Sequence, residues 1–87
     1  MIEVRYSAQF KKQYKKLPKK IREQFSKRLI TFFENEQHPQ LHIHKLSGAY
    51  EGLWSMSITG DIRAVFDKSY PNAALFVAIG SHSELYS

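Results

Sequence analysis

Apolar residues in the N-terminal part of the chain change from an alternating to a helical spacing. Apolar and polar residues alternate over residues 1–6, which predicts a strand. Beyond Ser7, a favourable N-cap residue, the apolar residues recur at the spacing of one helix face: Phe10, Tyr14 and Leu17. The chain is therefore expected to enter its first helix directly from a strand.

A second, longer helical pattern begins at Pro18, a residue type that is well tolerated in the first turn of a helix. The helix is expected to end before His38, because a residue that precedes proline disfavours helical backbone. The two helices should form a hairpin whose lysines face water and whose aromatic side chains face a sheet. The apolar stripe of the second helix consists of Ile21, Phe25, Leu29, Phe32 and Phe33.

The second half of the chain reads as three strands separated by turns. The strands are expected at residues 53–58, 62–67 and 74–79, and short connections of this kind favour antiparallel neighbours. The predicted fold class is α+β with the order β-α-α-β-β-β, a helical hairpin packed on one face of a small antiparallel sheet. We expect a single domain over residues 1–87. The side chains expected to be largely buried are Phe10, Tyr14, Ile21, Phe25, Leu29, Phe32, Val65, Phe66, Phe76 and Val77.

Positive charge is concentrated in the predicted helices. The 87 residues carry a net charge of +5, and Glu23 is the only acid among the basic residues of the tract 11–28. Such a field attracts nucleic acid, an anionic membrane or an acidic partner protein. A solvated helix face is the commoner meaning of a charge run, but the asymmetry here favours a polyanion or an acidic partner. The lysines expected to contact such a partner, RNA included, are Lys11, Lys12, Lys15, Lys16, Lys19, Lys20 and Lys45.

Composition limits how the protein can be stabilised and where in the cell it is expected. The chain has no cysteine, so neither disulfides nor a thiolate metal site stabilise it. No apolar run approaches the length of a membrane span, and residues 1–6 lack the apolar core of a signal peptide. These features are typical of a cytoplasmic protein, which is the localisation we expect.

Titratable side chains gather in the loop-like stretch 37–52 and at the C-terminus. Two histidines can exchange protons near neutral pH, an arginine can hold a phosphate, and an aromatic ring can stack on an unpaired base. Such a set suits cleavage of RNA by its own 2′-hydroxyl, a reaction that requires no metal and no cofactor. The candidates are His38, His42, His44, Lys45, Asp61, Arg63, His82, Glu84 and Tyr86.

Each candidate also has a purely structural interpretation. His42 and His44 would share a face of an extended segment and so could bind a metal, but no third ligand is evident and a surface pair is favoured. Glu84 has capping-box spacing from Ser81, which predicts a short helical turn at the C-terminus. His38 then belongs simply to a loop, Asp61 shapes a turn, Tyr86 anchors the C-terminus, and Trp54 packs in the core.

Three motifs together resemble the RelE/ParE superfamily of bacterial and archaeal toxins, nearest its YafQ-like RNA-cleaving branch. They are the segments 44–54 (HKLSGAYEGLW), 60–66 (GDIRAVF) and 80–86 (GSHSELY). The resemblance covers the whole chain and implies a ribosome-dependent mRNA endonuclease. Its implied partners are the ribosome, mRNA and an antitoxin protein that wraps its surface.

The resemblance also implies roles for particular residues. His44 matches the histidine proposed as general base, Arg63 an arginine that contacts the scissile phosphate, and His82 the proposed general acid. Asp61 matches an acidic residue of the site and Tyr86 its terminal aromatic. The chain departs from YafQ-like sequences at two positions, where it has a serine instead of a histidine and an isoleucine instead of a tryptophan: Ser57 and Ile62.

Two other functions remain open within this superfamily. ParE-like members share the fold but inhibit DNA gyrase without cutting nucleic acid, and an inactive member would only bind its antitoxin. The combination of His44, Arg63 and His82 favours the nuclease, because a gyrase inhibitor needs no acid–base set.

Overall fold

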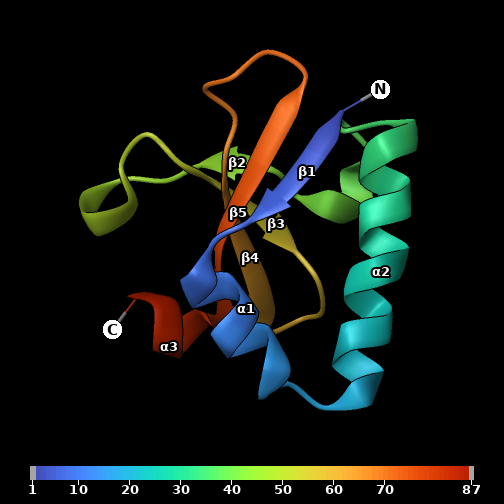
Figure 1. Ribbon diagram of the computed structural model, residues 1–87, viewed down its shortest axis with the longest axis vertical. Helices are drawn as coiled ribbons and strands as arrows, with labels where there is room; N and C mark the ends of the chain where they lie inside the picture. Colours follow the sequence, from blue (N-terminus) through green and yellow to red (C-terminus); the bar gives the residue numbers. More distant parts are fainter. Residues whose placement is uncertain (1, 87) are drawn as a thin grey trace.

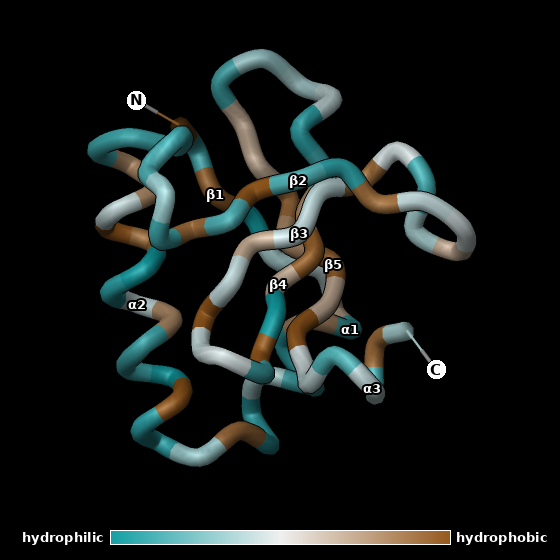
Figure 2. Tube along the Cα trace, turned by 180° about the vertical axis from the view of Figure 1, so that it is seen from behind, coloured by the Kyte–Doolittle hydropathy of each residue, from teal (hydrophilic) through white to brown (hydrophobic). Residues whose placement is uncertain are grey.

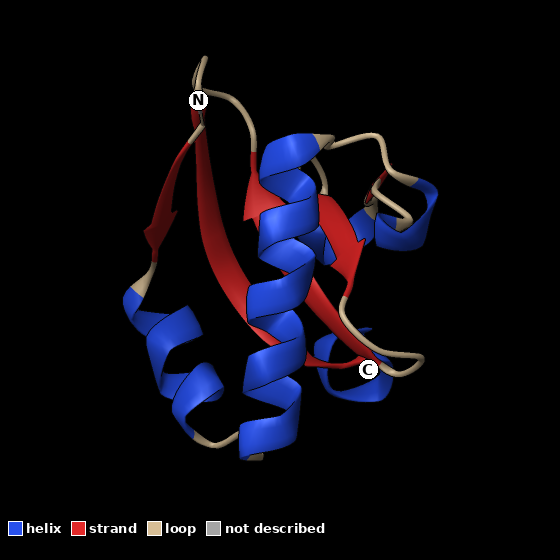
Figure 3. Ribbon diagram, turned by 90° about the vertical axis from the view of Figure 1, so that its right-hand side faces the viewer, coloured by secondary structure: helices blue, strands red, loops and turns tan. Residues whose placement is uncertain are grey.

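The computed structural model describes residues 2–86 and has a five-stranded sheet with the order β1-β5-β4-β3-β2. Two helices, α1 and α2, cover one face of this sheet (Figures 1 and 3). No helix among the described residues is long and apolar enough to cross a membrane. The elements are β1 (Glu3–Tyr6), α1 (Ala8–Lys15), α2 (Lys19–Glu34), β2 (His44–Lys45), β3 (Trp54–Ser57), β4 (Ile62–Asp67), β5 (Ala73–Ser81) and α3 (His82–Tyr86).

The predicted α+β class and helical hairpin are confirmed, but the sheet is mixed rather than antiparallel. Strands β2, β3, β4 and β5 pair antiparallel, as their short connections require, whereas β1 pairs parallel with β5. Parallel pairing arises because the chain returns to β1 only after passing through both helices and three strands. Sequence spacing alone contains no information about this long-range neighbour.

Local signals in the sequence set most helix boundaries. Ser7 caps α1, since its Oγ accepts a hydrogen bond from the backbone N–H of Phe10 at 3.0 Å. Pro18 is the residue immediately before α2, and the helix ends at Glu34, well before His38. Two elements fall outside the predicted order of six: α3, which the capping-box spacing had indicated, and β2, which lies within the stretch expected to be a loop.

The main core lies between the helices and the sheet. Hydrophobic segments run along the central strands, while α2 alternates between hydrophilic and hydrophobic segments (Figure 2). Four side chains expected to be largely buried are only half-buried: Tyr14, Ile21, Leu29 and Val77. The other six predicted core side chains are buried: Phe10, Phe25, Phe32, Val65, Phe66 and Phe76.

Phe33 does not face the sheet as its place in the predicted apolar stripe required. Its neighbour Phe32 is 1% exposed, whereas Phe33 is 47% exposed. Successive residues of an α-helix point about 100° apart, so both rings of a Phe-Phe pair cannot face one sheet. With Ile30, which is 59% exposed, Phe33 leaves an apolar strip on the outer side of α2.

Candidate active site

The sheet face opposite α1 and α2 carries the predicted site residues of the strands. Residues paired directly across antiparallel strands share a face. Ser57 pairs with Arg63, and Arg63 pairs with Gly80. One register step away, His44 pairs with Ser55. Three strands therefore contribute polar side chains to one surface.

α3 closes one end of this surface. Strand β5 runs directly into α3, and a β-carbon placed on Gly80 would lie 3.3 Å from Oε1 of Glu84 and 3.7 Å from Cδ2 of Leu85. The helix thus packs over the position that neighbours Arg63. In addition, the backbone N–H of His82 donates to the carbonyl oxygen of Asp61 at 3.0 Å, which ties the start of β4 to the start of α3.

The predicted capping box of α3 is present. The hydroxyl of Ser81 accepts from the backbone N–H of Glu84 at 3.2 Å, and the carboxylate of Glu84 accepts from the backbone N–H of Ser81 at 2.8 Å. These bonds, the backbone one first, lower the pKa of Glu84 below its usual value. The helix that positions His82 is therefore held by a reciprocal pair of hydrogen bonds.

A second, smaller apolar cluster supports α3 on this face. Val65, Ala78 and Leu85 form its buried centre. Tyr86 packs at its edge, with its ring 5.8 Å from that of Tyr50 and 4.7 Å from the imidazole of His82. Tyr86 therefore anchors the C-terminal helix, and its ring also contacts the candidate residue His82.

The ring of His44 is held in one tautomer. Its Nδ1 lies 2.9 Å from the carbonyl oxygen of His42. A carbonyl oxygen only accepts, so in the neutral ring the hydrogen is on Nδ1 and the lone pair is on Nε2. The side chain is exposed, and Nε2 is therefore available to accept a proton.

Arg63 is positioned by backbone carbonyls rather than by a carboxylate. Its Nη1 donates to the carbonyl oxygens of Thr59 at 2.8 Å and Ile62 at 3.2 Å. The side chain lines a cavity of about 290 Å³ together with Arg28, Gln40, His42, Ser57, Thr59 and Gly60. Sequence reasoning missed Arg28 as a site residue because it lies within the basic tract of α2, where spacing does not distinguish it from the neighbouring lysines.

The pair His42 and His44 does not have the extended geometry that would place both rings on one face. His42 has a positive φ of 46°, and this left-handed residue turns the chain between the 3₁₀ turn Pro39–Leu41 and β2. Residues 2–86 contain no group of three or more histidine or acidic side chains arranged to hold a metal ion. His38 has a local role, since its Nδ1 accepts from the backbone N–H of Gln40 at 3.1 Å.

Asp61 and Lys45 are both exposed. Asp61 occupies the turn between β3 and β4, where its backbone N–H donates to Oγ1 of Thr59 at 3.2 Å. Lys45 places its ammonium 5.6 Å from the ring centre of Trp54, and Lys68 approaches the same ring at 4.7 Å. Trp54 is half-buried against the main core, which confirms its predicted structural role.

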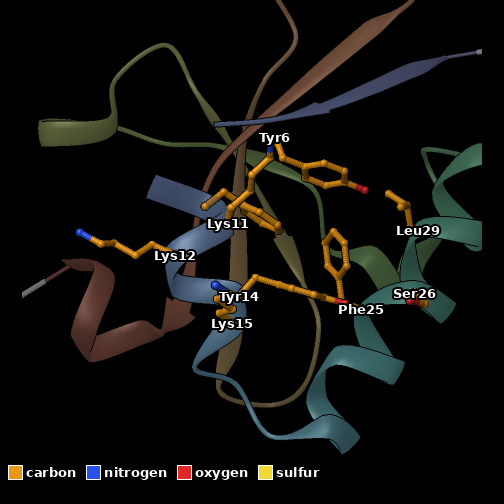
Figure 4. Close-up of a pocket in the computed structure, with 9 residues that line it drawn as sticks. Tyr6, Lys11, Lys12, Tyr14, Lys15, Phe25, Ser26 and Leu29 are labelled. Carbon is orange, nitrogen blue, oxygen red and sulfur yellow. The ribbon is translucent and has the colours of Figure 1, made fainter. Parts of the chain in front are cut away.

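A groove lies between β1, α1 and α2, away from the candidate active site. It has a volume of about 570 Å³. Figure 4 shows Tyr6 and Phe25 between the two helices, with Leu29 beyond them. Burial, with a smaller contribution from Tyr14, raises the pKa of Tyr6, so its hydroxyl stays neutral near pH 7. The basic side chains that line the groove all come from α1: Lys11, Lys12 and Lys15.

The fold is that of known bacterial toxins. YafQ from E. coli strain BL21(DE3) matches with a TM-score of 0.75 and 21% identity over 100% of both chains. A YoeB/ParE toxin from Agrobacterium tumefaciens matches with a TM-score of 0.76 and 15% identity, covering 93% of this chain and 99% of that chain. The E. coli DinJ–YafQ toxin–antitoxin complex matches with a TM-score of 0.74 and 22% identity, covering 99% of this chain and 98% of that chain.

The sequence specifies which class of toxin this is. Residues 2–87 match the family described as bacterial toxin of type II toxin-antitoxin system, YafQ. The chain belongs to this family, which confirms the resemblance noted from its motifs. No match was found among curated protein sequences.

Proposed function

We propose that this type II toxin is a ribosome-dependent mRNA endonuclease that cleaves without a metal ion. One observation carries the proposal: β4, which bears Arg63, pairs on one side with β5, which leads to His82, and on the other side only β3 separates it from β2, the strand of His44. In-line displacement at phosphorus needs a base on the side of the attacking oxygen and an acid on the side of the leaving oxygen. An arginine flanked by two histidines matches that requirement.

The proposed reaction is transesterification. Nε2 of His44 takes the proton of the 2′-hydroxyl, and the 2′-oxygen forms a bond to the adjoining phosphorus. The bond from phosphorus to the 5′-oxygen breaks, and the imidazolium of His82 gives that oxygen a proton. Arg63 stabilises the charge that develops on the phosphoryl oxygens. The products are a 2′,3′-cyclic phosphate and a 5′-hydroxyl.

Asp61 and Tyr86 act on His82 in this proposal. The Asp61 carbonyl holds the backbone of His82, and the ring of Tyr86 supports its imidazole. Ser57 and Ile62 stand where YafQ-like sequences have histidine and tryptophan, so this chain must hold its substrate base by other means. We expect its codon preference to differ for that reason.

The proposed regulator is a cognate antitoxin with an acidic, amphipathic segment. Solved neighbours include the DinJ–YafQ complex and a YoeB–YefM complex from Staphylococcus aureus. In this chain the groove between β1, α1 and α2 combines apolar walls with lysines from α1, which favours a partner helix with one apolar and one acidic face.

The test is cleavage of a defined mRNA on programmed ribosomes by the purified toxin. We expect cuts phased with the ribosome, a 2′,3′-cyclic phosphate at the new end, and full activity from toxin that was stripped with EDTA and freed of the chelator before it met the ribosomes. The ParE-like alternative predicts gyrase-linked DNA breaks and intact mRNA in the same preparation. Intact mRNA without DNA breaks would identify an inactive, antitoxin-binding member.

A further inference from the structure

Two guanidinium groups from different layers of the fold line one cavity. Arg28 comes from α2 and Arg63 from β4, and they meet at the turn that joins β3 to β4. The cavity has a volume of about 290 Å³, and none of its lining residues is acidic. The cavity thus combines two arginines and His42 with the backbone of Gly60 and has no counter-charge among its lining residues.

Backbone carbonyls hold Arg28 in place without neutralising it. Its Nε donates to the carbonyl oxygen of Ile58 at 3.3 Å, and its Nη1 donates to both oxygens of Gln40, at 3.3 and 3.2 Å. These bonds leave the two hydrogens on Nη2 without a partner inside the described chain. On Arg63 only Nη1 donates hydrogen bonds, so the hydrogens on Nε and Nη2 likewise have no partner inside the described chain.

Neither arginine belongs to an ion pair. The salt bridges found within residues 2–86 join Arg5 to Glu3, Lys19 to Glu23, and Lys68 to Glu36. Two like charges that share a cavity repel each other, and an anion bound between them would relieve that repulsion. Free, fixed N–H groups of guanidinium also match the oxygens of a phosphate better than a lysine ammonium does.

We propose that Arg28 and Arg63 form a phosphate clamp for a backbone phosphodiester of single-stranded RNA, with Arg28 as a positioning residue supplied by α2. This inference rests on the proposed nuclease function. A backbone phosphate is favoured over a free anion because Arg63 also borders the surface between His44 and His82. A strand held in the cavity therefore contacts the same arginine that stabilises the phosphoryl oxygens in the proposed reaction.

The test uses a non-cleavable RNA decamer that carries 2′-deoxyribose at the cleavage position. Its affinity for the isolated toxin is measured by fluorescence anisotropy over a series of salt concentrations. Arg28→Gln should weaken binding about tenfold or more, the value of a charge-assisted hydrogen bond. The slope of log K against log salt should become shallower by about 0.7, the value for one single-strand phosphate contact.

Two matched variants separate charge from geometry. Lys27→Gln removes one charge from the adjacent, exposed position of α2 and should have a much smaller effect on affinity. Arg28→Lys keeps the charge but loses the fork of donors, so it should restore the salt slope and recover only part of the affinity. A residue that merely joined α2 to Ile58 and Gln40 would lower the melting temperature without changing the salt slope.

The outcomes distinguish this inference from the function on which it rests. If folded Arg28→Gln binds the decamer like wild type, the proposed phosphate clamp is wrong, even if mRNA on programmed ribosomes is still cut. If binding of the decamer depends on Arg28 but wild-type toxin leaves ribosome-bound mRNA intact, the phosphate clamp is supported and the nuclease function is contradicted. Sodium phosphate that competes with the decamer at equal molar concentration would identify a free-anion site and overturn the assignment to RNA.

Discussion

At the scale of single residues, ring hydrogen bonds distinguish the histidines. His38 uses Nδ1 to accept from the backbone of Gln40, so that nitrogen cannot also bind a proton without losing the turn. His44 donates through Nδ1 and keeps Nε2 free. His82 is exposed at the first position of α3, and its ring lies 4.7 Å from that of Tyr86. Only the latter two histidines suit proton transfer.

The replacement His82→Ala should reduce the cleavage rate by about 10²–10⁴-fold, which is what general acid catalysis typically contributes. Ribosome binding should persist because the lysines are untouched. The measurement is single-turnover cleavage on programmed ribosomes, with His38→Ala as the control that keeps the wild-type rate. A His82→Ala protein that is folded and cleaves normally would remove His82 from the mechanism.

The sequence offered candidate site residues but did not indicate how their side chains are held. Arg63 was recognisable because it lies in a strand motif, and His82 because it follows an apolar strand. Arg28 was not, since its meeting with Arg63 depends on how α2 crosses the end of β3. The tautomer of His44 likewise depends on the left-handed turn at His42, which no residue pattern indicates.

At the scale of elements, α3 is short and depends on its cap. A helix of this length has little stability of its own. Its two capping hydrogen bonds and the packing of Leu85 supply what its backbone lacks. Because His82 is the first residue of α3, unfolding of this helix would also displace the proposed general acid.

Acid should loosen this helix. The pKa of Glu84 is lowered in the folded protein, first by its bond from the Ser81 backbone. A lowered carboxyl pKa means that the contribution to stability is complete above the usual pKa of glutamate and is lost as pH falls through the lowered value. The protection factor of the Ser81 amide, which is the exchange rate of an unstructured peptide divided by the rate that NMR measures for Ser81 at the same pH, should fall over that range.

Two substitutions check the role of the cap. Glu84→Ala should give rapid Ser81 exchange at every pH, whereas Glu84→Gln should keep partial protection that no longer varies in acid, since an amide can still accept the bond. Slow Ser81 exchange in Glu84→Ala would show that α3 is held by packing alone.

Sequence patterns predicted the helices and strands better than they predicted which strands pair with each other. The helices and β3 to β5 were found because their apolar spacing is regular and their turns are short. β2 was missed because two residues, His44 and Lys45, are too few to show any period. The parallel pairing of β1 was missed because it joins segments that are distant in the sequence.

At the scale of the whole molecule, aromatic rings dominate the main core. Phe25 is 3% exposed and lies between the rings of Phe10 and Phe76, both 5.5 Å away between centroids. It also contacts Tyr6 and Tyr14 at the floor of the groove. One side chain therefore connects α2 to β1, α1 and β5.

Truncating this side chain should be costly. Phe25→Ala should lower the free energy of unfolding by about 3–5 kcal/mol, measured by urea denaturation, because it leaves a large cavity. Phe33→Ala is the matched control on the same helix, and its effect should be much smaller because Phe33 is 47% exposed and lies outside the core. Equal losses for both variants would contradict the assigned core.

The exposed lysines of α1 and α2 act as a group. Replacing Lys11, Lys12 and Lys15 by glutamine should weaken binding to ribosomes and make the salt dependence shallower, since fewer counterions are released. The fold should be unaffected, because all three side chains are exposed. Unchanged binding between low and physiological salt would exclude a phosphate-tracking role for this surface.

The pairing of β5 with both β1 and β4 also determines when during synthesis the fold can be completed. β5 is made after every strand it joins, yet β1 and β4 both pair with it. α1 is bound to it as well, since Oε1 of Gln13 accepts from the backbone of Ile79 and Ser7 donates to Val77. In a nascent chain whose β5 is still inside the exit tunnel, β1 is not yet joined to the other strands and α3 has not formed. Under the proposed function, such a chain has no complete active site and cannot yet cleave mRNA.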